Sequence, residues 1–105
     1  MTVNREIIES PMAQGVDEVI IYTLDTLPWG GSPANVSVSV YDETERLHTD
    51  VTSTVMPTNS PMVVDDLVTL SPLIDLIEGN QYRVEVSWTS AGNTFEAFCI
   101  INAER

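Results

Sequence analysis

Apolar and polar side chains alternate along residues 81–88 and again along residues 95–101, on either side of a turn that contains Gly92. Alternation of this kind places the apolar side chains on one face of a β-strand, so each segment is expected to be a half-buried strand. The apolar positions are even-numbered before the turn and odd-numbered after it, and the two faces can pair only across a loop with an even number of residues. Either Ala91 and Gly92 or residues 90–93 therefore form the turn. The expected core face of this hairpin consists of Tyr82, Val84, Val86, Trp88, Phe95, Ala97, Cys99 and Ile101.

Short strand-like segments also fill most of the remaining chain. Residues 35–42 alternate in the same way, with Val36, Val38 and Val40 on the face expected to be buried. Three further segments are expected to be strands from their β-branched residues, and turns rich in Pro, Gly, Asn and Ser separate them. These segments are residues 17–24, 49–56 and 66–70. No stripe with helical spacing is present, although residues 71–80 could form one helical turn. The pattern predicts an all-β protein, an immunoglobulin-like antiparallel β-sandwich of about seven strands.

Tyr82 opens the alternating segment three residues after Gly79. This spacing is similar to the tyrosine corner of Greek-key sandwiches, in which the phenol bonds to the backbone of the preceding connection. A core aromatic residue without that hydrogen bond would fit the same spacing. Both interpretations are open at this point.

Residues 1–16 follow neither the helical nor the strand period and contain Pro11 and Gly15. We expect them to form an extended N-terminal arm, followed by one sandwich domain over residues 17–105. Ile7, Ile8 and Met12 have no partner in the sandwich pattern and need a surface to cover them. The arm is therefore predicted to dock on a neighbouring subunit, and to be dispensable for the stability of the isolated domain.

Composition narrows the classes of partner. The chain has 105 residues, a net charge of −12, four basic residues that are all scattered arginines, and 43% hydrophobic residues. Nucleic acid is not an expected partner, because binding to phosphates needs clustered cations. No apolar run is long enough to span a bilayer, and the first residues do not follow the pattern of a secretory signal, so we expect neither a membrane partner nor export. The single cysteine, Cys99, lies on the expected core face and is interpreted as a buried structural thiol.

The residues indicate no reaction and no cofactor. His48 is the only histidine, lies in an acidic loop and has no nucleophile motif beside it, so it is expected to be a solvated loop residue and the protein is not expected to be an enzyme. The acidic groups with oxygen ligands suited to calcium lack EF-hand spacing, and we assign no metal site, although weak calcium binding is left open. These groups are Asp42, Glu43 and Glu45, and Asp65 with Asp66.

Three large side chains are candidates for an interface. Phe98 and Ile100 fall on the face opposite Cys99, and a large apolar pair on an outer face indicates that the arm or a neighbouring subunit covers it. Trp29, in a loop rich in Pro and Gly, has two interpretations. It could form a sugar-binding platform, or it could fold over the open end of the sandwich.

The C-terminal third resembles a known group of domains. Gly79, Tyr82, Val84 and Val86, followed by "TSAGNTFEAFCI" and a final "ER", resemble immunoglobulin-like domains encoded among the head, neck and tail genes of tailed bacteriophages. The segment "DEVIIYTLDTLPWGGSPANVSVSV" is similar to the opening strand, Trp-bearing loop and alternating strand of that family. The resemblance covers residues 17–105. Asn93 stands where the family usually has a basic residue, and the N-terminal arm has no clear counterpart.

The resemblance implies a non-enzymatic virion structural module, such as a neck or fiber-tail adaptor. Its expected partners are other virion proteins and copies of itself in a symmetric assembly, and its expected location is the virion after synthesis in the host cytoplasm. Capsid decoration is a closely related alternative. A carbohydrate- or receptor-binding module is another, because immunoglobulin-like folds serve several functions.

Overall fold

The computed structural model describes residues 2–6, 10–44 and 48–104. Its longest hairpin consists of β8 (Gln81–Ser90) and β9 (Asn93–Glu104), joined by Ala91 and Gly92. Both turn residues have a positive φ, 50° and 82°, which matches the twist of a tight hairpin turn. The expected register is confirmed, with Trp88 opposite Phe95 and Tyr82 opposite Ile101.

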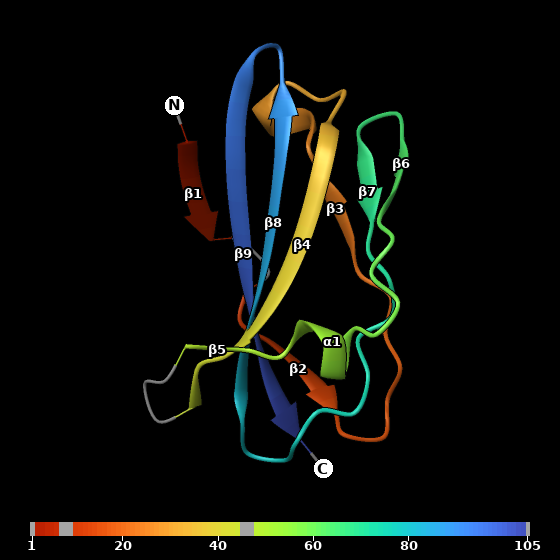
Figure 1. Ribbon diagram of the computed structural model, residues 1–105, viewed down its shortest axis with the longest axis vertical. Helices are drawn as coiled ribbons and strands as arrows, with labels where there is room; N and C mark the ends of the chain where they lie inside the picture. Colours follow the sequence, from red (N-terminus) through yellow and green to blue (C-terminus); the bar gives the residue numbers. More distant parts are fainter. Residues whose placement is uncertain (1, 7–9, 45–47, 105) are drawn as a thin grey trace.

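This hairpin is the centre of the larger of two sheets (Figure 1). Strand β4 (Ala34–Asp42) pairs antiparallel with β8, and the two-residue β5 (Thr49–Asp50) pairs with the far end of β4. The order across the sheet is β1-β9-β8-β4-β5, with β2 also paired to β9. The alternating segments expected from the sequence thus form the middle of the large sheet.

The N-terminal segment belongs to this sheet. Its backbone is extended, as expected, but β1 (Thr2–Glu6) and β2 (Met12–Gly15) both pair in parallel with β9. The expectation that this segment has no partner in the sandwich is wrong. The reason is that β9, with twelve residues, is longer than β8. Its long outer edge has backbone groups that need hydrogen-bond partners.

The smaller sheet contains three short strands in the order β3-β7-β6. They are β3 (Thr23–Asp25), β7 (Leu67–Thr69) and β6 (Met62–Val64), all paired antiparallel. Together the two sheets make an all-β sandwich, in which two parallel N-terminal strands, β1 and β2, flank the last strand of the large sheet. The fold class expected from the sequence is therefore observed.

Three local expectations differ from the structure. Residues 17–24 form β3 only at their end, together with a single bridge from Ile20 to Leu73. Residues 49–56 form β5 and a one-turn helix, α1 (Thr52–Val55), because Val55 and Met56 must both face the core within this short stretch. Residues 71–80 are not helical, and β6 was missed. Between β3 and β4 the only regular element is a 3-10 turn, η1 (Leu27–Trp29).

The core lies between the two sheets. Nine of the expected core residues are buried, and Val36 and Phe95 are partly buried against them. The nine are Val38, Val40, Tyr82, Val84, Val86, Trp88, Ala97, Cys99 and Ile101. The Tyr82 hydroxyl accepts a hydrogen bond from the backbone N–H of Ile77 at 2.9 Å, so Tyr82 is tied to the preceding connection in the manner of a tyrosine corner. Across the described ranges, no helix has the length and apolar character needed to cross a membrane.

Candidate functional site

The outer surface of the small sheet carries three apolar side chains beside the polar Thr23, Asp25 and Thr69. Val68 and Leu24 point into the core, so their neighbours along each strand point outward. Leu67 on β7 lies opposite Val64 on β6, and Met62 lies next to them on the same surface. Their exposed fractions are 65% for Met62, 58% for Val64 and 42% for Leu67. We call Met62, Val64 and Leu67 the small-sheet face.

Strand β6 is also the end of its sheet, and part of its backbone has no partner strand. A two-residue turn, Asp65 and Asp66, joins β6 to β7, and in such a hairpin the residues next to the turn exchange both hydrogen bonds. The next residue, Val63, therefore turns its N–H and C=O toward the open edge. Among the described residues no strand pairs with β6 on that side. Edge strands are usually protected by charged residues or proline, and β6 itself contains neither.

The hairpin is held firmly against the body of the protein. The backbone carbonyl of Asp66 accepts hydrogen bonds from the N–H and the hydroxyl of Thr26, at 2.9 and 2.8 Å. The side-chain carboxylate of Asp66 accepts a third hydrogen bond, from the N–H of Ser32 at 3.0 Å. Because these contacts fix the turn, the small-sheet face and the β6 edge are presented in a defined orientation, which lowers the entropic cost of binding.

The charged residues of the small sheet are all acidic. Its strands and the turn between β6 and β7, residues 23–25 and 62–69, contain three acidic residues and no arginine or lysine. The three are Asp25, Asp65 and Asp66. The apolar face is thus bordered by carboxylates, which favours a partner with positive charge.

Phe98 and Ile100 lie on the outer face of the large sheet, as expected, and are half-buried. The guanidinium carbon of Arg83 lies 3.7 Å from the centre of the Phe98 ring, and Arg83 Nε donates a hydrogen bond to Glu85 at 2.6 Å. The covering of Phe98 is thus provided at least in part by an arginine of the same sheet, which the sequence pattern did not indicate.

The other expected interface residues have different surroundings. Trp29 is partly buried against the core, and its ring meets Trp88 edge to face, with centres 5.6 Å apart. This position matches the interpretation that Trp29 folds over the end of the sandwich. Met12 packs partly against the core from β2. Ile7 and Ile8 lie outside the described residues.

His48 stacks on Tyr41 with ring centres 4.0 Å apart and contacts Glu43 through Nδ1 at 2.7 Å. In the described part of the chain no serine hydroxyl is a hydrogen-bond partner of His48. Nearby, hydrogen bonds from the side chain and the backbone of Thr52 lower the pKa of Asp50. These contacts organise the turn around β5 and show no arrangement for nucleophilic catalysis.

Several of the acidic residues considered as calcium ligands bond to other groups of the protein, including Glu43 to His48. Asp42 accepts hydrogen bonds from the Thr44 N–H and the Asn80 amide, and Asp66 is committed to Ser32. Glu45 lies outside the described residues. Within the described ranges, no three His, Cys, Asp or Glu side chains are placed to share a metal ion.

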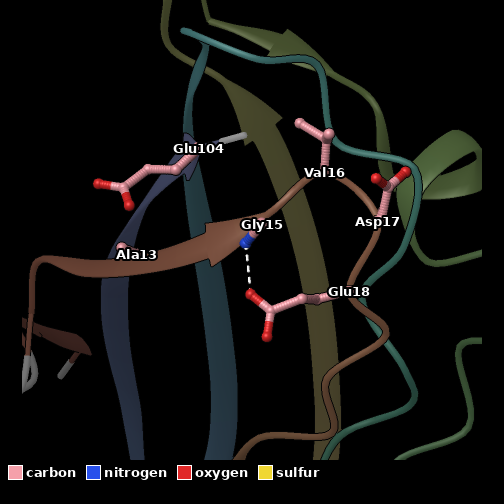
Figure 2. Close-up of a pocket in the computed structure, with 6 residues that line it drawn as sticks. All are labelled: Ala13, Gly15, Val16, Asp17, Glu18 and Glu104. Atoms are coloured by element: carbon pink, nitrogen blue, oxygen red, sulfur yellow. Dashed lines mark hydrogen bonds between the residues drawn. The ribbon is translucent and has the colours of Figure 1, made fainter.

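An open pocket of about 330 Å³ lies at the end of β2 (Figure 2). Three carboxylates border it, from Asp17, Glu18 and Glu104. Glu18 turns inward and accepts a hydrogen bond from the Gly15 N–H at 2.6 Å, whereas the Asp17 and Glu104 carboxylates point away from each other. The carboxylates therefore do not converge on a common ligand.

A buried hydrogen-bond network beside this pocket was not found by sequence reasoning. Gln14 on β2 is fully buried, and its amide donates to the carbonyl of Leu73 at 2.8 Å and accepts from the Tyr22 hydroxyl at 2.8 Å. Burial, with smaller effects of Cys99 and Glu18, raises the pKa of Tyr22 to about 12. The network joins β2 to the segment that precedes β3, and so connects the two sheets.

The small-sheet face was also missed by sequence reasoning. A signal was present, because "PMVVDDLVTL" contains two β-branched runs on either side of two aspartates, which is typical of a hairpin. The three consecutive apolar residues of β6 further indicated a strand with apolar side chains on both faces. That the outer of these faces stays exposed could be learned only from the structure.

Comparison with family models and with curated proteins gives no relative from which function could be transferred. No family model matches this chain, and no curated protein matches it. Since a β-sandwich can carry many functions, function has to be argued from the surfaces described above.

Proposed function

We propose that this protein is a non-enzymatic assembly module that binds a neighbouring protein through the small-sheet face. The observation that carries the proposal is the exposure of Met62, Val64 and Leu67 side by side on a rigid sheet. Contiguous apolar surface on a folded domain, bordered by polar residues, is typical of a protein interaction site. Full burial of such a side chain is worth about 1.5–3 kcal/mol, so three of them can anchor a partner.

The large sheet is a weaker candidate for the main docking surface. Its outer apolar residue Phe98 already lies under Arg83, which in turn is bonded to Glu85. A partner would have to displace this arrangement to reach the ring. The small-sheet face requires no such displacement.

More specifically, we propose that the assembly is the virion of a tailed phage, with the protein acting as a neck or fiber-tail adaptor. The support for this finer assignment is the resemblance of residues 17–105 and the immunoglobulin-like connectivity that the resemblance implies. A sugar-binding role would need an accessible aromatic platform, and Trp29 instead packs on Trp88.

The test is the incorporation of the tagged protein into phage particles whose own copy of the gene is deleted. Wild type is compared with Val64→Ser and Leu67→Ser, and with Ile77→Ser as a matched control, because Ile77 is 62% exposed but lies in the connection before β8. We expect the two small-sheet variants to be depleted from purified particles and the control to be retained. Absence of the wild-type protein from particles would contradict the virion assignment, and equal incorporation of all variants would contradict docking through the small-sheet face.

A further inference from the structure

We propose that the open edge of β6 binds an extended, positively charged segment of the partner protein as an added β-strand. This inference rests on the proposed docking function and names the form and charge of the segment that docks. It follows from three features of the small sheet: the unpaired backbone of Val63, the apolar residues on the outer face, and the carboxylates of Asp25, Asp65 and Asp66.

The backbone of β6 provides the first recognition element. Val63 turns one donor and one acceptor outward, because its neighbour Val64 exchanges its own hydrogen bonds with Leu67. An incoming strand can satisfy both groups of Val63 and continue the sheet beyond β6. The other short edge strands are poorer templates, because β5 has only two residues, one of them Asp50, and β3 ends in Asp25.

Side chains of β6 determine which residues of the added strand are bound. On the outer face the incoming strand would lie beside Met62 and Val64. Every second residue of that strand faces this side, and these residues are expected to be apolar. Val63, which is 42% exposed, offers a second apolar contact on the opposite side of the strand. Specificity thus comes from alternate side chains, and the added hydrogen bonds are independent of sequence.

Charge distinguishes a basic partner from a second copy of this chain. The small sheet carries three carboxylates, from Asp25, Asp65 and Asp66, and no arginine or lysine, and the whole chain has a net charge of −12. Two copies joined edge to edge would bring these carboxylates together, with Asp65 and Asp66 of each copy close to the shared edge. A segment with lysine or arginine near Asp65 is instead attracted.

The experiment measures binding of a synthetic peptide in which lysine and valine alternate, using fluorescence anisotropy with the wild-type protein. Val63→Pro removes the outward N–H and leaves the β6–β7 hydrogen bonds in place, and Val63→Thr is the matched control that keeps the N–H and the branched shape. The same peptide with N-methylated backbone amides tests the hydrogen bonds without any change in the protein. A peptide with glutamate in place of lysine tests the charge.

We expect Val63→Pro and backbone methylation each to weaken binding by at least about tenfold, because each removes hydrogen bonds and adds a steric clash at the edge. Val63→Thr should bind as the wild type does, the glutamate peptide should bind at least about tenfold more weakly, and added salt should weaken the lysine peptide.

Equal binding of the methylated and unmethylated peptides, or no binding of the lysine peptide to the wild type, would overturn strand addition. A dimer of the wild type in sedimentation that is abolished by Val63→Pro would assign the edge to a second copy and would also overturn the proposal. The proposed docking function has a separate readout, since Val64→Ser would still be depleted from particles if docking used the small-sheet face without an added strand.

Discussion

The two sheets of this protein use their apolar residues in opposite ways. On β8 every second side chain is buried, from Tyr82 to Trp88. On β6 all three side chains, Met62 to Val64, are exposed. The large sheet therefore accounts for most of the buried strand residues, whereas the small sheet contributes chiefly Leu24 and Val68 to the core and leaves the rest of its apolar surface outside. The difference indicates that stability resides mainly in the large sheet, and it leaves the small sheet available for the docking proposed above.

The edges of the two sheets also differ, because the large sheet has protected edges and the β6 edge of the small sheet is open. Parallel pairing with β1 and β2 covers the outer edge of β9, and Ser10 bonds to the Ile100 N–H between these strands. At the other end of the large sheet, β5 is short and ends in Asp50. The β6 edge carries no comparable protection within the described chain. An unprotected apolar edge is a liability in isolation, so its presence is best explained by a partner.

The largest expected loss of stability follows from a substitution in the core face of the large sheet. Trp88 is 1% exposed and contacts both Trp29 and Phe95. Trp88→Ala should lower the free energy of unfolding by about 3–5 kcal/mol, because it removes a large buried side chain and leaves a cavity. A urea titration measures this change. Stability close to that of the wild type would contradict the assignment of the core to this sheet.

The next largest loss of stability is expected from changes in the N-terminal segment. Gln14→Leu should lower the free energy of unfolding by about 1–3 kcal/mol, because the Tyr22 hydroxyl and the Leu73 carbonyl lose a buried partner. Deletion of residues 1–15 should destabilise at least as much, contrary to our expectation from the sequence of a dispensable arm. Thermal unfolding measures both. An unchanged melting temperature after the deletion would show that β1 and β2 are not integral to the large sheet.

A smaller loss of folding stability is expected at high pH, where Tyr22 ionises. Burial raises the pKa of Tyr22 from its ordinary value of 10.0 to about 12, so the folded state holds the phenol proton more tightly than the unfolded state does. The resulting stabilisation is complete below pH 10 and is lost as the pH rises toward 12. Tyr22→Phe should be less stable than the wild type at neutral pH and should lose less stability over this range. Urea titrations at several pH values measure the difference, and parallel pH profiles would contradict it.

The smallest effect on stability is expected on the small sheet. Val64→Ser should change the free energy of unfolding by no more than about 0.5 kcal/mol, as is usual for an exposed position. Val84→Ser is the matched control, because Val84 is 4% exposed on β8 and should be destabilised far more by the same replacement. If both variants lose similar stability in urea, the small sheet is more important to the core than the comparison implies.

Alternation at a period of two determined much of the large sheet. The positions from Tyr82 to Trp88 and from Phe95 to Ile101 allowed only an even-numbered turn, and the register of β8 and β9 followed. The spacing of Gly79 and Tyr82 raised the hydrogen bond to the preceding connection as one of two interpretations, and the structure contains that bond. These features could be predicted because the pairing residues are close in sequence and the side-chain pattern itself selects the buried face.

Only the tertiary structure decided how the remaining segments are used. Pairing of β1 and β2 with β9 joins parts of the chain about ninety residues apart through backbone groups, which leave no side-chain pattern to read. Burial of Gln14 depends on Tyr22 and the Leu73 carbonyl, and the position of Arg83 over Phe98 depends on two neighbouring strands. The same holds for β6, whose apolar residues look like core residues in sequence. They are exposed because β6 is the last strand of its sheet and nothing in the described chain lies beyond it.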